Sequence, residues 1–410
     1  MRSFSQNIFL IALWVASYIY YVAISDISVS AYTFLFLLLV FGLYKACKSN
    51  NTARFLLAYA ILAVTPLLTL SGQIGELTGF TRSEGSLPWL GVSFATLSIA
   101  YLVYKDKLNI KELFLNALQP LRFSSGPVVN RTLRQVLPNL ARVRIYFSWM
   151  VLGAFFYSVL AAGLAPLLFL KTSTHALDVL VFGIVFEIYV YLNFAGISFM
   201  VYGILGLVGV PATLNFNTPF ASRNIMEYWQ RWHLSFGAVL KEMIFNPLKK
   251  HLGLGITVIA VFMMSAMWHG VTFNFVVWGL FHGLAWVVAY QLSRLPWRRI
   301  GVLLNIALLP IIVVLGRIIF AESDEPMLTA KLTNLLFFRW SNEAYVANLI
   351  LDTKTTLCVV AASLYVASEV LRLRVSYRYK YWRKNSSMVI LLILVVFFGS
   401  TGLEGVYGTR

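Results

Sequence analysis

Cysteine and charged residues are both scarce in this sequence, and each scarcity excludes a class of protein. The two cysteines, Cys47 and Cys358, fall in or beside apolar stretches and cannot build a disulfide framework or a Cys/His metal cluster. Charged residues make up only 12% of the 410 residues, whereas hydrophobic residues make up 59%. This balance excludes a set of soluble domains, because most of the chain must then lie in lipid. P-loop, HExxH and GxSxG motifs are also absent, and we expect no metal site.

Long apolar runs, in contrast, are abundant, and they predict an all-α polytopic membrane protein. Several runs have only about 17 residues, the lower limit for crossing the hydrocarbon, so two or three are expected to be broken or re-entrant. The first run follows Arg2 as in a signal peptide, but without a small-x-small cleavage site, so we predict an uncleaved span. About 11 transmembrane helices are predicted, near residues 8–24, 31–47, 54–71, 88–104, 145–170, 176–197, 252–268, 272–292, 301–320, 355–371 and 388–404.

The formal net charge is +17, and the positively charged residues are concentrated on one predicted side of the membrane. With eleven spans and a cytosolic N-terminus, 26 of the 33 lysines and arginines fall in inside segments, six fall outside and Arg317 lies within a span. This bias follows the positive-inside rule. It predicts a multi-pass protein of the cytoplasmic membrane with its C-terminus outside, in contact with membrane lipid and not with nucleic acid.

Residues 211–251 form an inside segment that is not a simple span. Ser222 is the expected N-cap of a helix, and Glu227 and Arg231 stand four apart in the order that favours a helical ion pair. Two interpretations stay open: an interfacial helix with aromatic residues at the headgroups, or a re-entrant helix that lines a cavity. Apolar residues recur there at helical spacing, namely Ile225, Tyr228, Trp229, Trp232, Phe236, Val239, Leu240, Met243 and Ile244.

Two of the five histidines are the strongest candidates for chemistry. His233 and His269 each follow a tryptophan, and each lies where a helix approaches a membrane boundary. A neutral imidazole in a partly dry site can take a proton from a hydroxyl near neutral pH. His282 lies in mid-span, where a histidine commonly bonds to a neighbouring helix, and His175 and His251 are expected to be solvated.

Other polar residues in the spans have structural interpretations. Ser265 precedes His269 by one helical turn, so a Ser–His nucleophile pair stays open as an alternative, although no third, orienting group is identifiable. Glu187 and Arg317 each lie deep in a predicted span and are expected to form an ion pair, because an unpaired charge there is costly. The glycine-rich stretch 203–209 predicts close helix packing.

Two WH motifs carry a resemblance to a known family. The stretches "NFNTPF…EYWQRWHLSF" and "MWHGVTFNFVVWGLFHGL" resemble the membrane-bound O-acyltransferase superfamily, near its bacterial branch of teichoic-acid D-alanyl transfer proteins and alginate O-acetylases. Weaker matches lie at 87–104, 124–131 ("SSGPVVNR") and 192–200, and the resemblance covers roughly residues 85–340. It implies a ring of tilted helices around a thin central tunnel, with additional re-entrant or interfacial helices.

The resemblance also implies roles for individual residues. His269 would be the catalytic base, and His233 would line the same tunnel and act with it by orienting or polarising the carbonyl. A cytosolic donor would enter from one side and an acceptor hydroxyl from the other. Residues predicted to line or support the tunnel are Asn274, which could polarise a carbonyl, and Trp232, Trp268, Glu187 and His282.

The donor implied by the resemblance is an acyl thioester, carried by a phosphopantetheine carrier protein or by coenzyme A, with no permanently bound cofactor. An acyl carrier protein on the cytosolic face would need an apolar dock near lysines that attract its acidic surface. An acceptor or partner transferase is expected outside. The predicted docking residues are Lys241, Met243, Ile244, Phe245, Pro247, Leu248, Lys249 and Lys250.

The sequence thus predicts one integral membrane acyltransferase domain over residues 1–410. Its core is expected at about 85–340, with N-terminal helices at 1–84 and C-terminal helices at 341–410, and the acidic start of 321–354 is expected to cap the outer face. The expected reaction moves a small acyl group to a hydroxyl of a bacterial cell-envelope polymer. The leading hypothesis for this group is D-alanyl. The alternatives are O-acetylation of an exopolysaccharide or peptidoglycan, a non-catalytic assembly subunit, and, as a non-enzyme, a lipid flippase or transporter.

Overall fold

The computed structural model describes residues 38–63, 89–113, 127–128, 140–210, 212–337, 339, 345–371 and 385–400. These ranges are helical with connecting turns, and no strand occurs in them, as the all-α prediction expects. The predicted span at 8–24, most of the second half of the span at 54–71 and most of the "SSGPVVNR" motif lie outside the described residues.

Most helix bounds agree with the predicted apolar runs, but α8 (Ala176–Leu207) continues ten residues beyond the span predicted at 176–197. After helices at 38–47 and 51–63, the elements are α4 (Trp89–Tyr104), α5 (Ile110–Glu112), α6 (Leu140–Ala154), η3 (Phe155–Ala161), α7 (Ala162–Leu164), η4 (Ala165–Thr172), α8 (Ala176–Leu207), η5 (Pro219–Ala221), α9 (Ile225–Trp229), α10 (Leu234–Leu240), η6 (Lys241–Phe245), α11 (Asn246–Leu248), α12 (Leu254–His269), α13 (Phe273–Ser293), α14 (Arg298–Ala321), α15 (Glu325–Leu336), η7 (Tyr345–Asn348), α16 (Thr353–Val370) and α18 (Asn385–Phe398).

Membrane-spanning length is reached by four helical stretches of the described ranges. Residues 140–172, 176–207, 273–293 and 298–321 are each long and apolar enough to cross a bilayer. Other apolar helices, α12 among them, are shorter. The chain is therefore a helical membrane protein, and the number of eleven spans stays a prediction.

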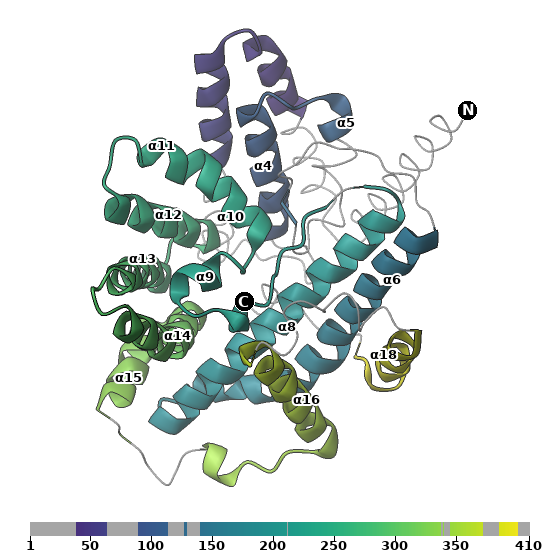
Figure 1. Ribbon diagram of the computed structural model, residues 1–410, viewed down its shortest axis with the longest axis vertical. Helices are drawn as coiled ribbons and strands as arrows, with labels where there is room; N and C mark the ends of the chain where they lie inside the picture. The colour runs from purple at the N-terminus through teal and green to yellow at the C-terminus, as the bar shows by residue number, and fades with distance from the viewer. Residues whose placement is uncertain are drawn as a thin grey trace, which may run out of the picture.

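Helices α6 and α8 form a closely packed pair, seen side by side as the diagonal of Figure 1. Glycines allow this approach: a Cβ on Gly153 would lie 2.5 Å from the Gly196 carbonyl oxygen, and one on Gly203 would lie 2.6 Å from the Tyr146 carbonyl oxygen. Gly206 faces the Tyr146 ring in the same way. The close packing predicted for this glycine-rich stretch is confirmed, as is usual for small residues between membrane helices.

Helices α12, α13 and α14 form a second packed group beside α8 (Figure 1). Small residues again sit at the contacts, since a Cβ on Gly279 would lie 2.9 Å from Ala266 Cβ and one on Gly183 would lie 2.8 Å from Val314. This group carries His269 at the end of α12 and places it among α13 and α14.

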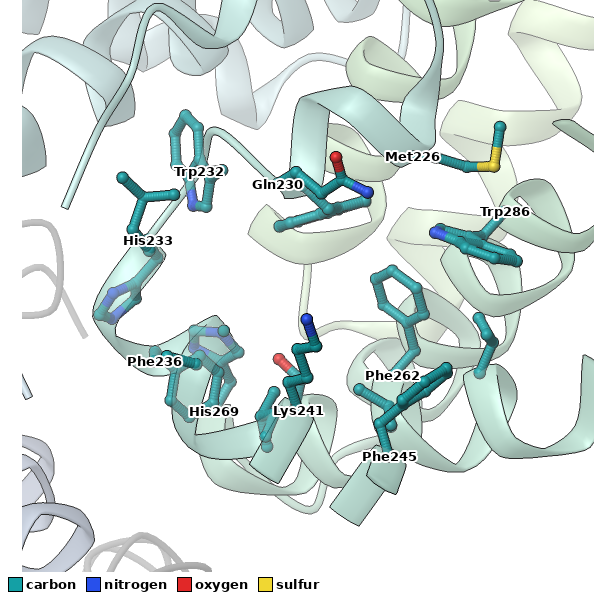
Figure 2. Close-up of a pocket in the computed structure, with 18 of the residues that line it drawn as sticks. Met226, Gln230, Trp232, His233, Phe236, Lys241, Phe245, Phe262, His269 and Trp286 are labelled. Carbon is teal, nitrogen blue, oxygen red and sulfur yellow. The ribbon is translucent and has the colours of Figure 1, made fainter. Parts of the chain in front are cut away.

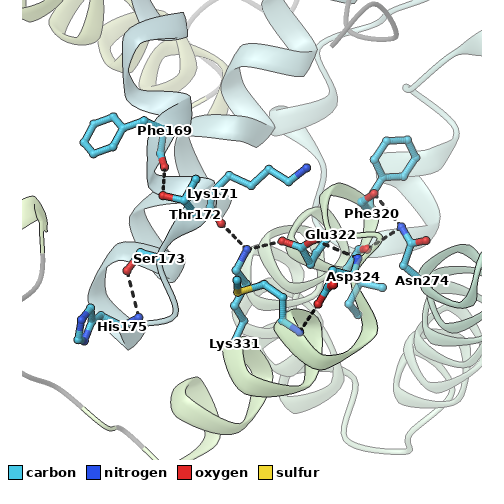
Figure 3. Close-up of polar contacts among 12 residues, drawn as sticks. Phe169, Lys171, Thr172, Ser173, His175, Asn274, Phe320, Glu322, Asp324 and Lys331 are labelled. Carbon is cyan, nitrogen blue, oxygen red and sulfur yellow. Dashed lines mark hydrogen bonds and ion pairs between the residues drawn. The ribbon is translucent and has the colours of Figure 1, made fainter. Parts of the chain in front are cut away.

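The segment that follows α14 covers the turn between η4 and α8. Lys331 on α15 donates to Glu322 Oε2 at 2.6 Å and also to the Lys171 carbonyl oxygen, and Figure 3 shows both contacts. Asn334 donates to the Thr174 carbonyl oxygen at 2.8 Å. The start of the acidic segment 321–354 therefore caps one end of the helical assembly, the end that the charge pattern predicts to be outside.

Candidate functional site

The segment 211–251 forms several short helices and not one continuous helix. Helix α9 ends at Trp229 and α10 begins at Leu234. The predicted N-cap Ser222 is wrong: Asn224 caps α9, and its Oδ1 accepts the Glu227 N–H at 2.7 Å, because Ser222 is still part of the turn that ends η5. The predicted pair of Glu227 and Arg231 is confirmed, at 2.6 Å.

The break between α9 and α10 lies at His233, whose φ of 44° is in the left-handed region. A residue with a Cβ adopts this conformation only when its surroundings compensate the strain. Here the Asn215 carbonyl oxygen accepts the Leu234 N–H at 2.9 Å, and Asn215 Oδ1 accepts the Ser235 hydroxyl at 2.5 Å. Ser235 in turn accepts the Val128 N–H at 2.9 Å. These bonds fix the direction in which the His233 imidazole points.

A cavity of about 660 Å³ brings the two candidate histidines together. Figure 2 shows His233 and His269 on its wall, with Lys241 reaching toward the same space from η6. The segment 211–251 thus lines a cavity, as the second interpretation expected. The wall is mostly aromatic and aliphatic, and its other polar residues are Gln230, Ser265 and Arg317.

His233 lies in an apolar environment. Its imidazole is 5% exposed and contacts the rings of Phe94, Phe194 and Phe236, with centroids 4.8–5.9 Å away. Neither ring nitrogen has a hydrogen-bond partner among the described residues. Burial lowers the pKa of His233 to about 3, so this imidazole is neutral at physiological pH and can still donate one hydrogen bond and accept another.

His269 is the last residue of α12 and is half-buried. Its ring packs against Trp268 and Phe320, with centroids 4.7 and 4.9 Å away. Trp268 also contacts the His233 ring, at 6.2 Å, and its indole N–H donates to Ser93 at 2.9 Å. Trp268 therefore stands beside both imidazoles and is held by α4, although it is not part of the cavity wall.

Asn274 does not reach the cavity. Its amide nitrogen donates to the carbonyl oxygens of Ile319 and Phe320 at 3.2 and 3.1 Å (Figure 3). The Thr272 hydroxyl donates to the Asn274 amide oxygen at 2.5 Å. Both amide hydrogens are used in joining the start of α13 to the end of α14. This geometry does not support the predicted role of Asn274 in polarising a substrate carbonyl.

Glu187 and His282 lie behind the main cavity. With Tyr228 and Arg317 they line a second, small cavity of about 10 Å³, roughly the size of one water. Nδ1 of His282 has no hydrogen-bond partner among the described residues, so the expected bond to a neighbouring helix is not formed there. The predicted ion pair of Glu187 and Arg317 is confirmed, at 2.5 Å.

The predicted docking residues divide into four groups. Lys241 and Phe245 line the cavity, while Lys249 and Lys250 are exposed. Met243 is 1% exposed and packs in the core, so it is not part of an exposed dock. The remaining three, which are half-buried, are Ile244, Pro247 and Leu248.

Two residues of the site were not singled out from the sequence as parts of it. Asn215 lies within the recognised "NFNTPF" stretch, but its support of the His233 turn depends on a fold that periodicity does not give. Arg317 was expected only to neutralise Glu187, whereas it also forms part of the cavity wall. Hydropathy indicates how deep Arg317 lies in the membrane, but it does not give the direction in which the side chain points.

The fold and the site define a helical membrane protein with an internal cavity that carries two imidazoles. The model of the membrane-bound O-acyltransferase family matches residues 121–322, which include both histidines. Just under half of the chain thus matches this family, and the matched region lies within the core predicted at 85–340.

The relatives of the chain are named for the transfer of different acyl groups. The chain is similar to a teichoic acid D-alanyltransferase of Streptococcus thermophilus, at 24% identity over 282 residues, 60% of this chain and 66% of that protein. A peptidoglycan O-acetyltransferase of Helicobacter pylori is 36% identical over 99 residues, 23% of this chain and 19% of that protein. A probable alginate O-acetylase of Azotobacter vinelandii is 28% identical over 131 residues, 26% of each chain. The matches span less than two thirds of each relative.

Proposed function

We propose that this chain transfers a small acyl group from a thioester to a hydroxyl, with His269 as the general base. The observation that carries the proposal is the shared cavity, in which His233 and His269 from separate helices face one space of about 660 Å³. That volume is in the range of small-molecule sites, and the aromatic wall keeps much water out. His233, neutral and without a protein partner among the described residues, is suited to orient the reacting groups by a hydrogen bond.

The two substrates would approach from opposite faces of the membrane. The Lys241 end of the cavity belongs to the segment that the charge pattern places inside, so a cytosolic thioester would enter there. His269 lies near the capped end, which would face the acceptor. With this arrangement we propose a ring of about eleven spans around a tunnel, with the N-terminus cytosolic and the C-terminus outside.

The proposed acyl group is D-alanyl or acetyl, and the proposed acceptor is a polymer of the cell envelope. The longest of the matches described above, to a D-alanyltransferase, supports D-alanyl. The shorter match at higher identity, to a peptidoglycan O-acetyltransferase, supports acetyl. Both groups fit the cavity and use the same base, so the reaction class does not depend on the choice.

Mild base release from cell envelopes tests the reaction class and names the acyl group. Cells with and without the chain are compared, and the acetate and D-alanine released from ester linkages are both measured. We expect one of the two acids to increase with the chain. If neither acid changes while the protein is present in the membrane, the proposed transfer is wrong.

A lipid flippase or transporter is the non-enzymatic alternative. Its support is the buried pair of Glu187 and Arg317, since such proteins place charges along a path. A flippase would leave both released acids unchanged and would tolerate loss of the His269 imidazole.

Lys249 and Lys250 provide a test of the proposed carrier-protein donor. Both are exposed, and with Lys241 they make a basic inner surface beside the cavity. Replacing both with Glu is expected to slow transfer from an acyl carrier protein about tenfold at low salt, because the attraction that speeds encounter is reversed. The measurement is the initial rate with a carrier-bound thioester, compared with a coenzyme A thioester, at low and high salt.

The matched control is Arg298→Glu with Arg299→Glu, two exposed residues on the same predicted face but at the start of α14. This pair is expected to leave the carrier-dependent rate near wild type. Equal losses in both double variants would show general charge repulsion and would contradict a dock at η6 and α11.

A further inference from the structure

Arg317 is held by a fully bonded carboxylate. Its Nε donates to Glu187 Oε2 at 2.5 Å, and the Tyr228 hydroxyl donates to the other oxygen, Oε1, at 2.5 Å. The side chains of Arg317 and Glu187 are only 8% and 4% exposed. The group joins α8, α9 and α14, so three separate elements determine where the guanidinium lies.

The guanidinium also lies on the wall of the main cavity. It is stacked over Trp232 at 5.0 Å and over Phe320 at 5.5 Å, and the Phe320 ring contacts His269 at 4.9 Å. Among the described residues that line the cavity, Arg317 and Lys241 are the cations and no carboxylate is present. Lys241 is exposed on η6, so Arg317 is the buried positive charge on the side of His269.

The ion pair of Lys331 and Glu322 is also buried, but it does not border the main cavity. Lys331 and Glu322 are equally well buried, and Lys331 is bonded at the same time to the Lys171 carbonyl oxygen. That pair fastens α15 to the end of η4 and is not on the wall of the main cavity. Burying a charge is costly, and joining helices alone does not require that the charge border an open volume.

We propose that Arg317 is a further catalytic residue, which stabilises the negative charge that develops on the thioester carbonyl oxygen. This inference rests on the proposed function. As the acceptor oxygen bonds to the acyl carbon, its proton passes to His269 and the carbonyl electron pair moves to oxygen. The resulting oxyanion lies against the guanidinium N–H groups. On collapse the carbon–sulfur bond breaks, and the thiolate leaves with the proton from His269. A fixed cation in a dry site favours this charge separation.

Glu187 and Tyr228 are positioning residues in this arrangement. Neither lines the main cavity, and they act by fixing the guanidinium over Trp232. Tyr228→Phe removes one hydroxyl and keeps the ring that stacks on Trp232. It is expected to lower kcat less than loss of the guanidinium does, with little change in KM for the donor.

The decisive variant is the double substitution Glu187→Gln with Arg317→Gln, because it removes the charge without leaving an unpaired one. The control is Lys331→Gln with Glu322→Gln, which removes the other buried pair in the same way. Transfer is measured with S-acetyl-phosphopantetheine and S-D-alanyl-phosphopantetheine as donors and isolated envelopes as acceptor, per amount of folded protein. We expect kcat to fall about 10²- to 10³-fold in the first double variant, with KM for the donor within threefold of wild type, and to stay near wild type in the second.

Three outcomes separate the inference from the function on which it rests. Loss of transfer in the Glu187/Arg317 variant and in His269→Ala, with the Lys331/Glu322 variant active, supports the inference. Loss in His269→Ala with an active Glu187/Arg317 variant overturns the role of Arg317 and leaves the proposed function standing. Equal losses of transfer per folded protein in the two double variants also overturn it, because the Glu187/Arg317 pair is then only structural.

Discussion

Replacing His269 with Ala is expected to reduce base-releasable acyl groups in the cell envelope to background. A general base contributes about 10²- to 10⁴-fold to a rate, and no second basic group in the described structure is placed to replace it. His233, the other imidazole of the cavity, is enclosed by Phe94, Phe194 and Phe236, and Lys241 is a cation at the inner end. The measurement is acetate and D-alanine released by mild base, at matched amounts of membrane-inserted protein.

Two further variants make the His269 result specific. His251→Ala removes an exposed imidazole outside the cavity and is expected to retain full transfer. Ser265→Ala decides the remaining nucleophile alternative, because Ser265 lies one turn before His269 and also lines the cavity. Transfer that survives Ser265→Ala excludes an acyl-serine intermediate. Normal acyl release from the His269→Ala protein would show that His269 is a packing residue and would leave a flippase or an assembly subunit as the better interpretation.

The parts of the fold that follow from local composition could be predicted from the sequence. Helices α12, α13 and α14 begin and end within three residues of the predicted spans, since hydropathy reports directly which residues lie in lipid. The pair of Glu187 and Arg317 could be predicted as well, because a charge in a long apolar helix is costly unless another charge compensates it. In both cases the free-energy cost of placing polar groups in hydrocarbon determines the outcome, and local composition reports that cost.

The turn at His233 could not be predicted, because its cause is not local. Helical periodicity runs through residues 225–244 without a Gly or Pro at the break, and propensity alone continues the helix. The helix stops because Asn215 supplies bonds to Leu234 and Ser235 that are better satisfied with His233 at positive φ. Tertiary hydrogen bonds therefore override the local preference for a continuous helix, and they also fix the orientation of the His233 imidazole.

The direction of a side chain around its helix was the other source of error. Asn274 follows the second WH motif closely, yet it lies at the start of α13 where two carbonyl oxygens of α14 take its amide hydrogens. Met243 shares the apolar stretch of the predicted dock, but its backbone oxygen accepts the Tyr59 hydroxyl and its side chain is in the core. Both outcomes depend on which neighbouring helix faces the residue, and a single sequence does not contain that information directly.

The contact between α6 and α8 provides the largest expected effect on stability. In Gly153→Ala the new Cβ would lie 2.5 Å from the Gly196 carbonyl oxygen and 2.6 Å from the Met200 nitrogen, both backbone atoms of α8. Backbone cannot rotate away as a side chain can, so the two helices must separate along their whole contact. Overpacking of this kind costs about 1–3 kcal/mol or more. We expect a clear fall in the thermal unfolding midpoint in detergent and a smaller membrane-inserted fraction.

Gly255→Ala is the matched control, because it makes the same chemical change in another membrane helix. Its Cβ would meet only Val287, at 3.6 Å, which is ordinary van der Waals contact. Alanine is also the better helix former by about 1 kcal/mol, so the unfolding midpoint is expected to stay unchanged or to rise slightly. A Gly153→Ala protein as stable as the Gly255→Ala protein would show that α6 and α8 are not in backbone contact. The support of α8 for Glu187, and through it for Arg317 and the cavity, would then need a different explanation.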